Sequence, residues 1–228
     1  MNYEEIMKRL QSMANPEAVK GMARYGINPN ENLGISIYQL RPLAKEIGKD
    51  HILALKLWDS GVHDARLLAV FVEDPAKVTE KQMDSWAADF DSWDVCDQAC
   101  TSLFDGTPHA WKKIVEWAER DEEFVKRAAF STIAGLAVHD KAARDEQFER
   151  LGTIIKKHAI DKRNYVKKAV NWALRNIGKR NRTLNKKMIK LAKELQASKS
   201  KSARWIANDA LRELTGEKVQ RKLEKKKD

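Results

Sequence analysis

The sequence is poor in the residues that build metal centres and disulfide scaffolds. Among 228 residues there are two cysteines, five histidines and five prolines. Two cysteines cannot form a framework of several disulfides, and no histidine lies at ligand-like spacing from another histidine or from a cysteine. The sequence therefore argues against a metal site, and we expect Cys96 and Cys100, one helical turn apart, to be small core residues.

Long hydrophobic runs are also missing. No stretch of about 18 apolar residues occurs, which argues against a membrane-spanning helix. The first residues, Met1 to Glu5, are acidic, whereas a signal peptide begins with basic and then apolar residues. With 43% hydrophobic residues the chain has enough apolar side chains to fold. We expect a soluble, cytoplasmic, globular protein with no membrane partner.

Basic residues are abundant, and they are unevenly distributed. The formal net charge is +10. Residues 1–114 contain 13 Lys and Arg against 17 Asp and Glu, a net charge of −4, whereas residues 115–228 contain 30 against 16, a net charge of +14. A basic second half predicts an anionic partner, and nucleic acid is the first candidate. Basic surfaces also occur in proteins that bind no nucleic acid, so charge alone does not decide the question.

Apolar residues recur with the 3.6-residue period of a helix in nearly every segment, and no run alternates with a period of two. This pattern predicts an all-α protein. The expected helices are 3–14, 16–25, 36–47, 50–58, 62–72, 79–88, 93–104, 108–120, 122–138, 144–158, 163–178, 183–196 and 202–215. Thr79 and Gln82 have the spacing of a capping box. We expect residues 1–216 to form one domain and residues 217–228 a basic, flexible tail.

A weak internal repeat runs through these helices. Residues 124–129 match residues 165–170 at a spacing of 41, and residues 64–69 and 202–207 are looser copies. Repeated two-helix units of about 40 residues are typical of a HEAT-like α-solenoid, in which one set of helices lines a concave face. The repeat places four basic residues at equivalent positions: Arg66, Arg127, Lys168 and Arg204. They form either a stripe that contacts DNA phosphates or solvated ends of ordinary helices.

The seven tryptophans fall into different surroundings. Four lie within apolar stripes and are expected in the core: Trp58, Trp86, Trp111 and Trp117. Trp93 and Trp172 instead have charged neighbours, which favours aromatic surface, although packing remains the alternative. Trp93 and Asp97 are four residues apart, so they share one helical face. An aromatic ring beside a carboxylate can hold a cation.

Four segments together resemble a known family. They are Met22-Ala23-Arg24-Tyr25, Ser92-Trp93-Asp94-Val95-Cys96-Asp97, Lys126-Arg127-Ala128-Ala129 and Tyr165 to Arg175. In this order and at these spacings they are similar to the signature blocks of the bacterial HEAT-like-repeat DNA alkylation repair glycosylases, the AlkD-like proteins. The resemblance covers roughly residues 16 to 215. It implies a monomeric, right-handed α-solenoid whose concave basic face holds double-stranded DNA.

The resemblance also implies an activity and roles for individual residues. Enzymes of this family release purines alkylated at N3 or N7 by hydrolysing the N-glycosidic bond, without a deep base pocket and without a cofactor. By this resemblance Asp97 is the catalytic carboxylate, and Trp93 and Trp172 are the aromatic pair against the damaged nucleotide. Arg127 is a clamp on the adjacent DNA backbone and Tyr25 an aromatic residue near the same cleft, with Lys168 and Arg175 among the DNA-binding residues.

One position departs from the family pattern. Gly34-Ile35-Ser36 stands where better-known members carry a longer amide side chain after Gly-Ile, so a contact near the DNA is lost or replaced. The family also contains branches that bind DNA, including branched junctions, with little or no glycosylase activity. Two alternatives to a glycosylase therefore remain: a non-catalytic protein that recognises distorted or branched DNA, and a HEAT-like scaffold that binds proteins.

Overall fold

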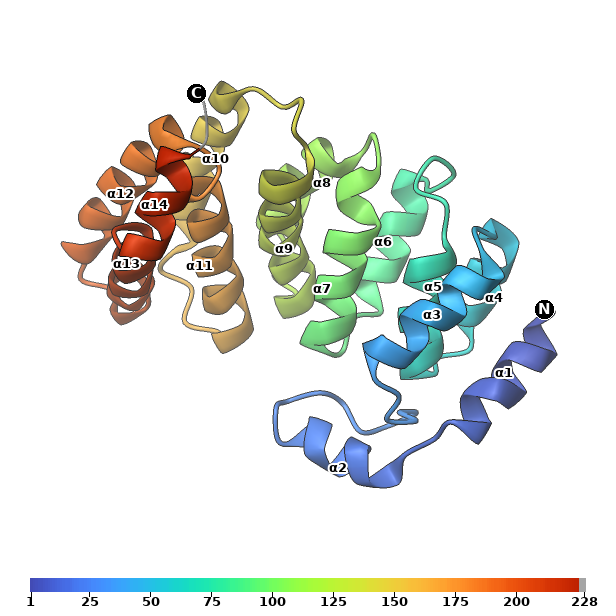
Figure 1. Cartoon of the computed structure of the whole chain (residues 1–228). Coiled ribbons are helices and arrows are strands. Elements are labelled where there is room, and N and C mark those ends of the chain that lie inside the picture. The colour runs from blue at the N-terminus through green and yellow to red at the C-terminus, as the bar shows by residue number, and fades with distance from the viewer. Residues whose placement is uncertain (226–228) are drawn as a thin grey trace. The chain divides into compact units, whose positions relative to one another are not determined.

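The computed structural model describes residues 1–225, and all regular structure in this range is helical (Figure 1). The helices are α1 (Tyr3–Ser12), α2 (Pro16–Ala23), α3 (Ile37–Ile47), α4 (His51–Asp59), α5 (His63–Val72), α6 (Glu80–Ala88), α7 (Trp93–Ser102), η1 (Phe104–Gly106), α8 (Ala110–Ala118), α9 (Glu123–His139), α10 (Asp145–His158), α11 (Asn164–Gly178), α12 (Arg182–Gln196), α13 (Lys201–Leu214) and α14 (Glu217–Glu224). The predicted all-α class is confirmed. Each predicted helix is present, with ends that differ by a few residues.

The chain divides into two compact units, Met1–His109 and Ala110–Asp228, where the sequence alone suggested one domain. The second unit includes α14, which lies in the segment expected to be a flexible tail. Val219 and Leu223 on α14 are buried, at 8% and 2% exposure, because their four-residue spacing places both on one face. Residues 217–225 are therefore ordered helix and its end, and the rest of the expected tail lies outside the described residues.

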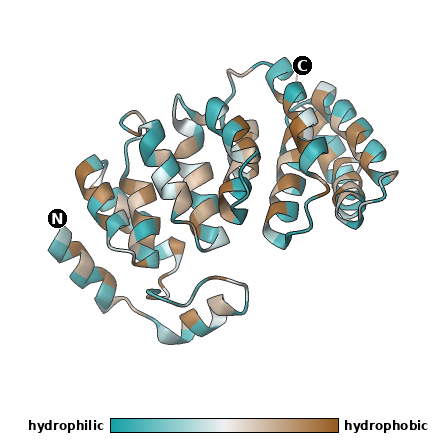
Figure 2. Cartoon of the chain, turned by 180° about the vertical axis from the view of Figure 1, so that it is seen from behind, coloured by the Kyte–Doolittle hydropathy of each residue, from teal (hydrophilic) through white to brown (hydrophobic). Residues whose placement is uncertain are grey.

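The first unit has a row of alternate helices covered by a second layer. Helix α5 packs against both α3 and α7, and α4 packs against α5. The stacked indoles of Trp58 and Trp86, with ring centroids 4.0 Å apart, join α4 to α6. Hydrophobic and hydrophilic residues alternate around each helix, which gives each one a face for this packing (Figure 2). The indole rings of Trp58 and Trp86 are both buried, as predicted.

The second unit repeats the same arrangement. Helix α11 packs against α9 and α13, and α10 packs against α12 in the other layer. The repeated segments lie at the starts of α9, α11 and α13, where Ala128, Ala169 and Ala203 are fully buried. These small side chains let neighbouring helices approach, as the repeat predicted. At the other end of α11 a Cβ on Gly178 would lie 2.7 Å from the methyl groups of Leu214, so a larger residue there would require the Leu214 side chain to move.

Two other tryptophans belong to this unit's packing. Trp117 is buried at 1% exposure, as predicted. Trp111 is partly exposed rather than buried, because its Nε1 reaches the rim of the core and donates to Asp140 Oδ2 at 3.2 Å. Its ring still packs against Phe148 at 5.2 Å. The apolar stripe identified the correct face of α8 but not how deeply the ring lies.

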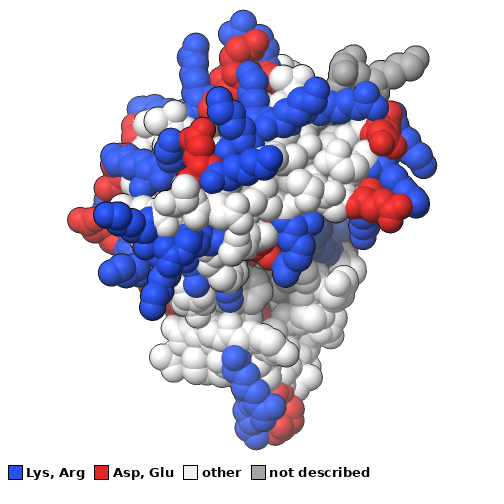
Figure 3. Space-filling model, turned by 90° about the vertical axis from the view of Figure 1, so that its left-hand side faces the viewer, with Lys and Arg blue, Asp and Glu red and all other residues white. Residues whose placement is uncertain are grey.

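The two units carry opposite net charge. Residues 1–109 contain 11 Lys and Arg against 17 Asp and Glu, whereas residues 110–228 contain 32 against 16. Figure 3 looks onto the side where the last helices lie, and Lys and Arg cover more of this surface than the separate patches of Asp and Glu between them. The excess positive charge of the second unit is therefore exposed to solvent on this side. Within residues 1–225, none of the helices has the length and apolar character needed to cross a membrane.

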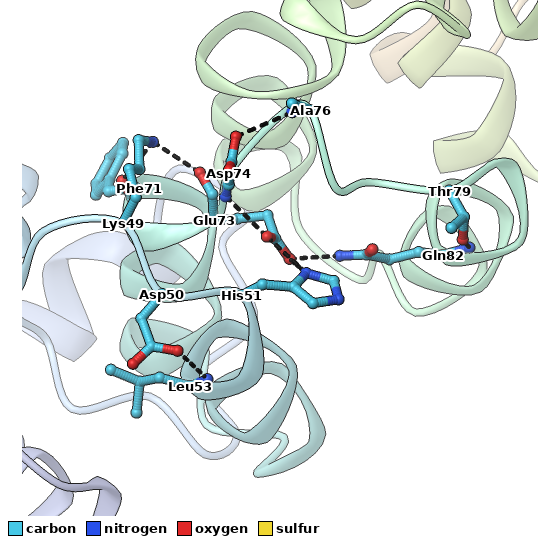
Figure 4. A network of polar contacts seen from close by, with 10 residues as sticks. All are labelled: Lys49, Asp50, His51, Leu53, Phe71, Glu73, Asp74, Ala76, Thr79 and Gln82. Carbon is cyan, nitrogen blue, oxygen red and sulfur yellow. Dashed lines mark hydrogen bonds and ion pairs between the residues drawn. The ribbon is translucent and has the colours of Figure 1, made fainter.

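A buried carboxylate joins three helices of the first unit (Figure 4). Glu73 is fully buried; its Oε1 lies 2.8 Å from His51 Nδ1, and its Oε2 accepts from Gln82 Nε2 at 2.7 Å. Lys49 Nζ donates to the Glu73 carbonyl at 2.7 Å. One of the two hydrogen bonds of the predicted capping box is present, because Thr79 Oγ1 accepts from the Gln82 backbone amide at 3.1 Å. The Gln82 side chain donates to Glu73 instead of bonding back to Thr79.

A second buried polar contact fixes the start of α7. His63 on α5 is 4% exposed, and its Nε2 lies 2.9 Å from Oδ2 of Asp94 in the first turn of α7. Burial lowers the pKa of His63, but the hydrogen bond and the negative charge of Asp94 outweigh burial, so the pKa lies above its ordinary value. Folding therefore favours the protonated, ion-paired form of this histidine.

This pair makes stability depend on pH. Because the folded-state pKa of His63 is raised, its contribution is complete below the unfolded-state value of about 6.5 and is lost as pH rises through the folded-state value. We expect the difference in unfolding free energy between wild type and His63→Gln to shrink from about pH 5.5 to about pH 8.5. Urea unfolding measures it, and Asp94→Asn should remove the same pH-dependent component. A difference that grows with pH would contradict this assignment.

Candidate nucleic-acid interface

Helix α7 has one buried face and one accessible face. Cys96, Ala99 and Cys100 are fully buried, which confirms the two cysteines as core residues. Trp93 and Asp97 are partly exposed and lie one helical turn apart. The buried face fixes the rotation of the helix about its axis, so the indole and the carboxylate are presented on the same side.

The loop before α3 is held by a carboxylate beneath it. Asp64 is fully buried and accepts hydrogen bonds from the Leu33 amide at 2.6 Å and the Ile35 amide at 2.7 Å. Burial raises the pKa of Asp64 above its ordinary value, and these backbone hydrogen bonds oppose that rise only in part. Gly34 between them has φ +74°, and a Cβ there would lie 2.3 Å from the Asn15 carbonyl oxygen. The loop thus has a defined conformation.

This loop is attached directly to the start of α7. The Asn28 amide donates to Ser92 Oγ at 2.8 Å, and Asn28 Nδ2 donates to Asp91 Oδ2 at 2.7 Å. Trp93 Nε1 donates to the Tyr25 carbonyl oxygen at 3.0 Å. The Tyr25 side chain itself is 77% exposed. The structure therefore brings Tyr25 and Trp93 together, as the resemblance implied, with Asp97 one turn further along α7.

Ser36, the residue that departs from the family pattern, begins α3. Its backbone amide donates to Gln39 Oε1 at 3.3 Å, and its Oγ donates to the same oxygen at 3.1 Å. Serine at a helix start is a common N-cap residue. Ser36 therefore makes a local contact with the Gln39 side chain in the first turn of α3.

Three of the four basic residues of the repeat donate hydrogen bonds to backbone carbonyl oxygens. Arg66 Nη1 donates to Asp89 O at 3.2 Å, at the end of α6, and its guanidinium carbon lies 5.3 Å from the Trp58 ring centroid. Arg204 Nη1 donates to Ser198 O at 2.8 Å, just beyond the end of α12. Helix ends leave carbonyl groups without intrahelical partners, so both arginines satisfy them. This geometry supports a structural role for Arg66 and Arg204.

Arg127 and Lys168 occupy the remaining equivalent positions. Arg127 is 5% exposed, and its Nη1 donates to Tyr165 O in the first turn of α11 at 2.7 Å. Lys168 on α11 is exposed. The repeat therefore identified positions that share a place on their helices, but the side chains at these positions have different environments.

Trp172 and Arg175 lie three residues apart on one face of α11. Trp172 is partly exposed. Arg175 Nη1 forms an ion pair with Glu213 on α13 and lies 3.6 Å from Asp209 Oδ2. Burial raises the pKa of Glu213, but Lys179 and Arg175 lower it by more than burial raises it. The pKa therefore lies below its ordinary value and the carboxylate is held ionised. The positive charge of Arg175 is therefore opposed by two acids.

Trp205 is an exposed aromatic residue to which the sequence analysis gave no role. Trp205 on α13 is 41% exposed, and Lys167 Nζ lies 4.7 Å from its ring centroid. The signal was present in the repeat, because Trp205 is the fourth residue of segment 202–207, the place that Arg127 and Lys168 hold in segments 124–129 and 165–170. A large aromatic residue at a position that is basic in these two segments is the difference that should have identified it.

The described residues that could bind a metal ion are not grouped into a site. In the part of the chain that the structure describes, no group of three or more His, Cys, Asp or Glu side chains is placed to hold a metal ion. The accessible groups are instead indole and phenol rings, lysines and the Asp97 carboxylate. Rings and basic side chains are the groups with which proteins contact nucleic-acid bases and phosphates.

Comparison with solved structures supports the HEAT-like fold. A protein described as belonging to "a new family of proteins related to the HEAT-like repeat DNA glycosylases with affinity for branched DNA structures" superposes with a TM-score of 0.78. The match covers 95% of this chain and 97% of that chain at 20% sequence identity. At this identity the likeness is one of fold.

Comparisons of sequence identify the family. Uncharacterized proteins from Listeria monocytogenes and Listeria innocua are 25% and 24% identical to this chain over 130 residues. Each match covers 55% of this chain and 58% of the relative, so less than two thirds of either relative is matched. A family model described as "DNA alkylation repair enzyme" matches residues 6–214, nearly the whole chain. The chain therefore belongs to the DNA alkylation repair enzyme family.

Proposed function

We propose that the protein is a DNA glycosylase that hydrolyses the N-glycosidic bond of N3- or N7-alkylated purines in duplex DNA. The observation that carries this proposal is the accessible face of α7, where Trp93 and Asp97 lie one turn apart above a fully buried face. Family membership supplies the DNA repair context. Asp97, Trp93 and Trp172 are assigned to catalysis.

The chemistry requires stabilisation of positive charge. An N-alkylated purine is already cationic and leaves as a neutral base, so the reaction needs no acid to protonate it. The C1′–N bond breaks as the sugar acquires oxocarbenium character, and water then adds to C1′ and loses a proton. An ionised Asp97 stabilises the sugar cation and orients the water. Protein groups fixed in place before the reaction lose little energy in reorganisation.

Aromatic rings extend this stabilisation. The electron-rich faces of Trp93 and Trp172 attract a cationic nucleotide, and each contact contributes about 0.5–2 kcal/mol. The hydrogen bond from Trp93 to the Tyr25 carbonyl holds the indole in place without using its π face. Because Trp172 belongs to the second unit, its role requires that both units contact the same DNA. Such a surface needs no deep base pocket, which distinguishes it from base-flipping enzymes.

The second unit supplies the electrostatic attraction. Its 32 Lys and Arg against 16 Asp and Glu favour a polyanion, and exposed Lys168 lies on α11 beside the partly exposed Trp172. Arg127, buried at the junction of α9 and α11, acts by fixing Tyr165 and the start of α11. We assign DNA contact first to Lys168 and Arg175. We expect the protein to act as a monomer without a cofactor.

Recognition of branched DNA without catalysis is the second candidate function. It is favoured by the structural likeness to a protein described as having affinity for branched DNA structures. The Ser36 hydroxyl bonds the neighbouring Gln39 side chain, at the position where the resemblance implies a longer amide side chain near the DNA. This function would use the same basic surface but would not need the Asp97 carboxylate.

Replacement of Asp97 tests the catalytic assignment. We expect Asp97→Asn to lower the rate of base release by about 10²–10³-fold, because a preorganised charge is lost at the reacting sugar. Its affinity for DNA should be unchanged or higher, since a carboxylate repels phosphates. The measurement is release of free 3-methyladenine and 7-methylguanine from methylated duplex, alongside a binding titration.

Asp59→Asn is the matched control, because it removes the same charge from an exposed position at the end of α4. It should retain base release. Wild-type release with Asp97→Asn would remove Asp97 from the mechanism. No release by the wild-type protein would leave only DNA binding.

The ion pairs of Arg175 predict a gain of affinity. Glu213→Gln removes a carboxylate that competes with DNA phosphates for Arg175. We expect about two- to fivefold tighter duplex binding at ~50 mM salt. Glu194→Gln is the control, since it makes the same charge change on α12, in the other layer, and releases Lys156 instead. Equal gains in both variants would assign the effect to net charge alone.

A direct comparison of substrates distinguishes the two candidate functions. A glycosylase should bind linear duplex and a four-way junction within about tenfold and release methylated bases. A branched-DNA protein should prefer the junction by more than that and release none. Both should lose orders of magnitude of affinity between ~50 and ~200 mM salt if six or more phosphates are contacted. A shallow salt slope would point to a protein scaffold.

A further inference from the structure

The starts of α11 and α13 border a hollow that the proposed glycosylase chemistry does not use. It has a volume of about 1060 Å³ and lies entirely within the second unit. Its wall is formed by the connection before α11, by the first turn of α11 and by the connection into α13. Trp205 and Ile160, which are 41% and 60% exposed, form its apolar surface.

The charged groups of this hollow have one sign. Four lysines line it and no acidic side chain does; these are Lys162, Lys167, Lys199 and Lys201. In residues 1–225 none of the four forms an ion pair with a carboxylate. The neighbouring Asp161 carboxylate is bound by Arg163 at 2.6 Å and does not neutralise them. The hollow is therefore complementary to an anion.

Trp205 occupies an exposed position of the repeat. It is the fourth residue of segment 202–207 and corresponds to Lys168, which is also exposed, in segment 165–170. Trp205 keeps two fifths of its surface accessible, and the amine of Lys167 is placed over its ring. An indole at this exposure, ringed by lysines, offers a π surface next to positive charge.

We propose that this hollow binds single-stranded DNA, with one unpaired base stacked on Trp205 and the flanking phosphates at the four lysines. Rings that stack on bases within a basic groove are the usual means of binding single strands without sequence preference. An acidic peptide would satisfy the lysines but would leave the indole without a stacking partner. The inference rests on the proposed function only in that the partner is DNA.

The test is binding of the full-length protein to a fluorescent ten-residue oligothymidylate. Trp205→Ala should weaken binding by about 5- to 100-fold, the effect of losing one stacked base, whereas Trp205→Phe should stay within about threefold of wild type. Lys167→Gln should weaken binding, and Lys186→Gln, an exposed lysine of the same unit outside the hollow, should do so less. Unchanged affinity in Trp205→Ala would overturn the proposal.

A ten-residue abasic oligonucleotide separates stacking from charge. It keeps the phosphates and lacks the bases, so Trp205→Ala should bind it as wild type does. Equal losses on both probes would overturn stacking, as would binding of polyglutamate that depends on Trp205. Base release from methylated duplex should persist in Trp205→Ala, and oligothymidylate binding should persist in Asp97→Asn. The single-strand binding proposal and the glycosylase proposal can therefore be overturned independently of each other.

Discussion

A buried carboxylate must be compensated by hydrogen bonds or by a cation, and the first unit is organised around this requirement. Asp64 receives two backbone amides from the loop before α3, and Glu73 receives the side chains of His51 and Gln82. The partly exposed Asp94 pairs with the buried side chain of His63 through one of its two oxygens. Each contact joins segments that are distant in sequence. The loop beside α7 and the first turn of α7 are therefore held by polar contacts with other segments, as electrostatic preorganisation of the proposed site requires.

Most of the fold could be predicted from local sequence. Helical periodicity located the helices, and the repeated segments with their small residues, 124–129, 165–170 and 202–207, identified the row of α9, α11 and α13. The division into two units could not be predicted in this way, because it depends on how densely each half packs against itself. Helix α14 was missed because its many basic residues concealed Val219 and Leu223, whose four-residue spacing is the signal of a buried face.

The candidate site could be predicted only in part. The spacing of Trp93 and Asp97 on one helix is a local property and was correctly assigned. The contact from Trp93 to Tyr25 was not predictable from residue types, because the acceptor is a backbone carbonyl that every residue carries. For the same reason, equivalence within the repeat could not show that Arg66 and Arg204 are bonded to helix ends. Such contacts depend on where the chain passes in three dimensions.

The burial of both cysteines has a consequence for the proposed function, which would place the protein among agents that methylate DNA. Thiols are among the most readily methylated groups of a protein, and reagents must reach the sulfur to react. Cys96 and Cys100 are fully buried on the inner face of α7, directly behind Trp93 and Asp97. While the helix stays folded, the agents that damage DNA cannot poison the protein through either sulfur. The helix that carries the proposed catalytic residues thus also shields both thiols from alkylating agents.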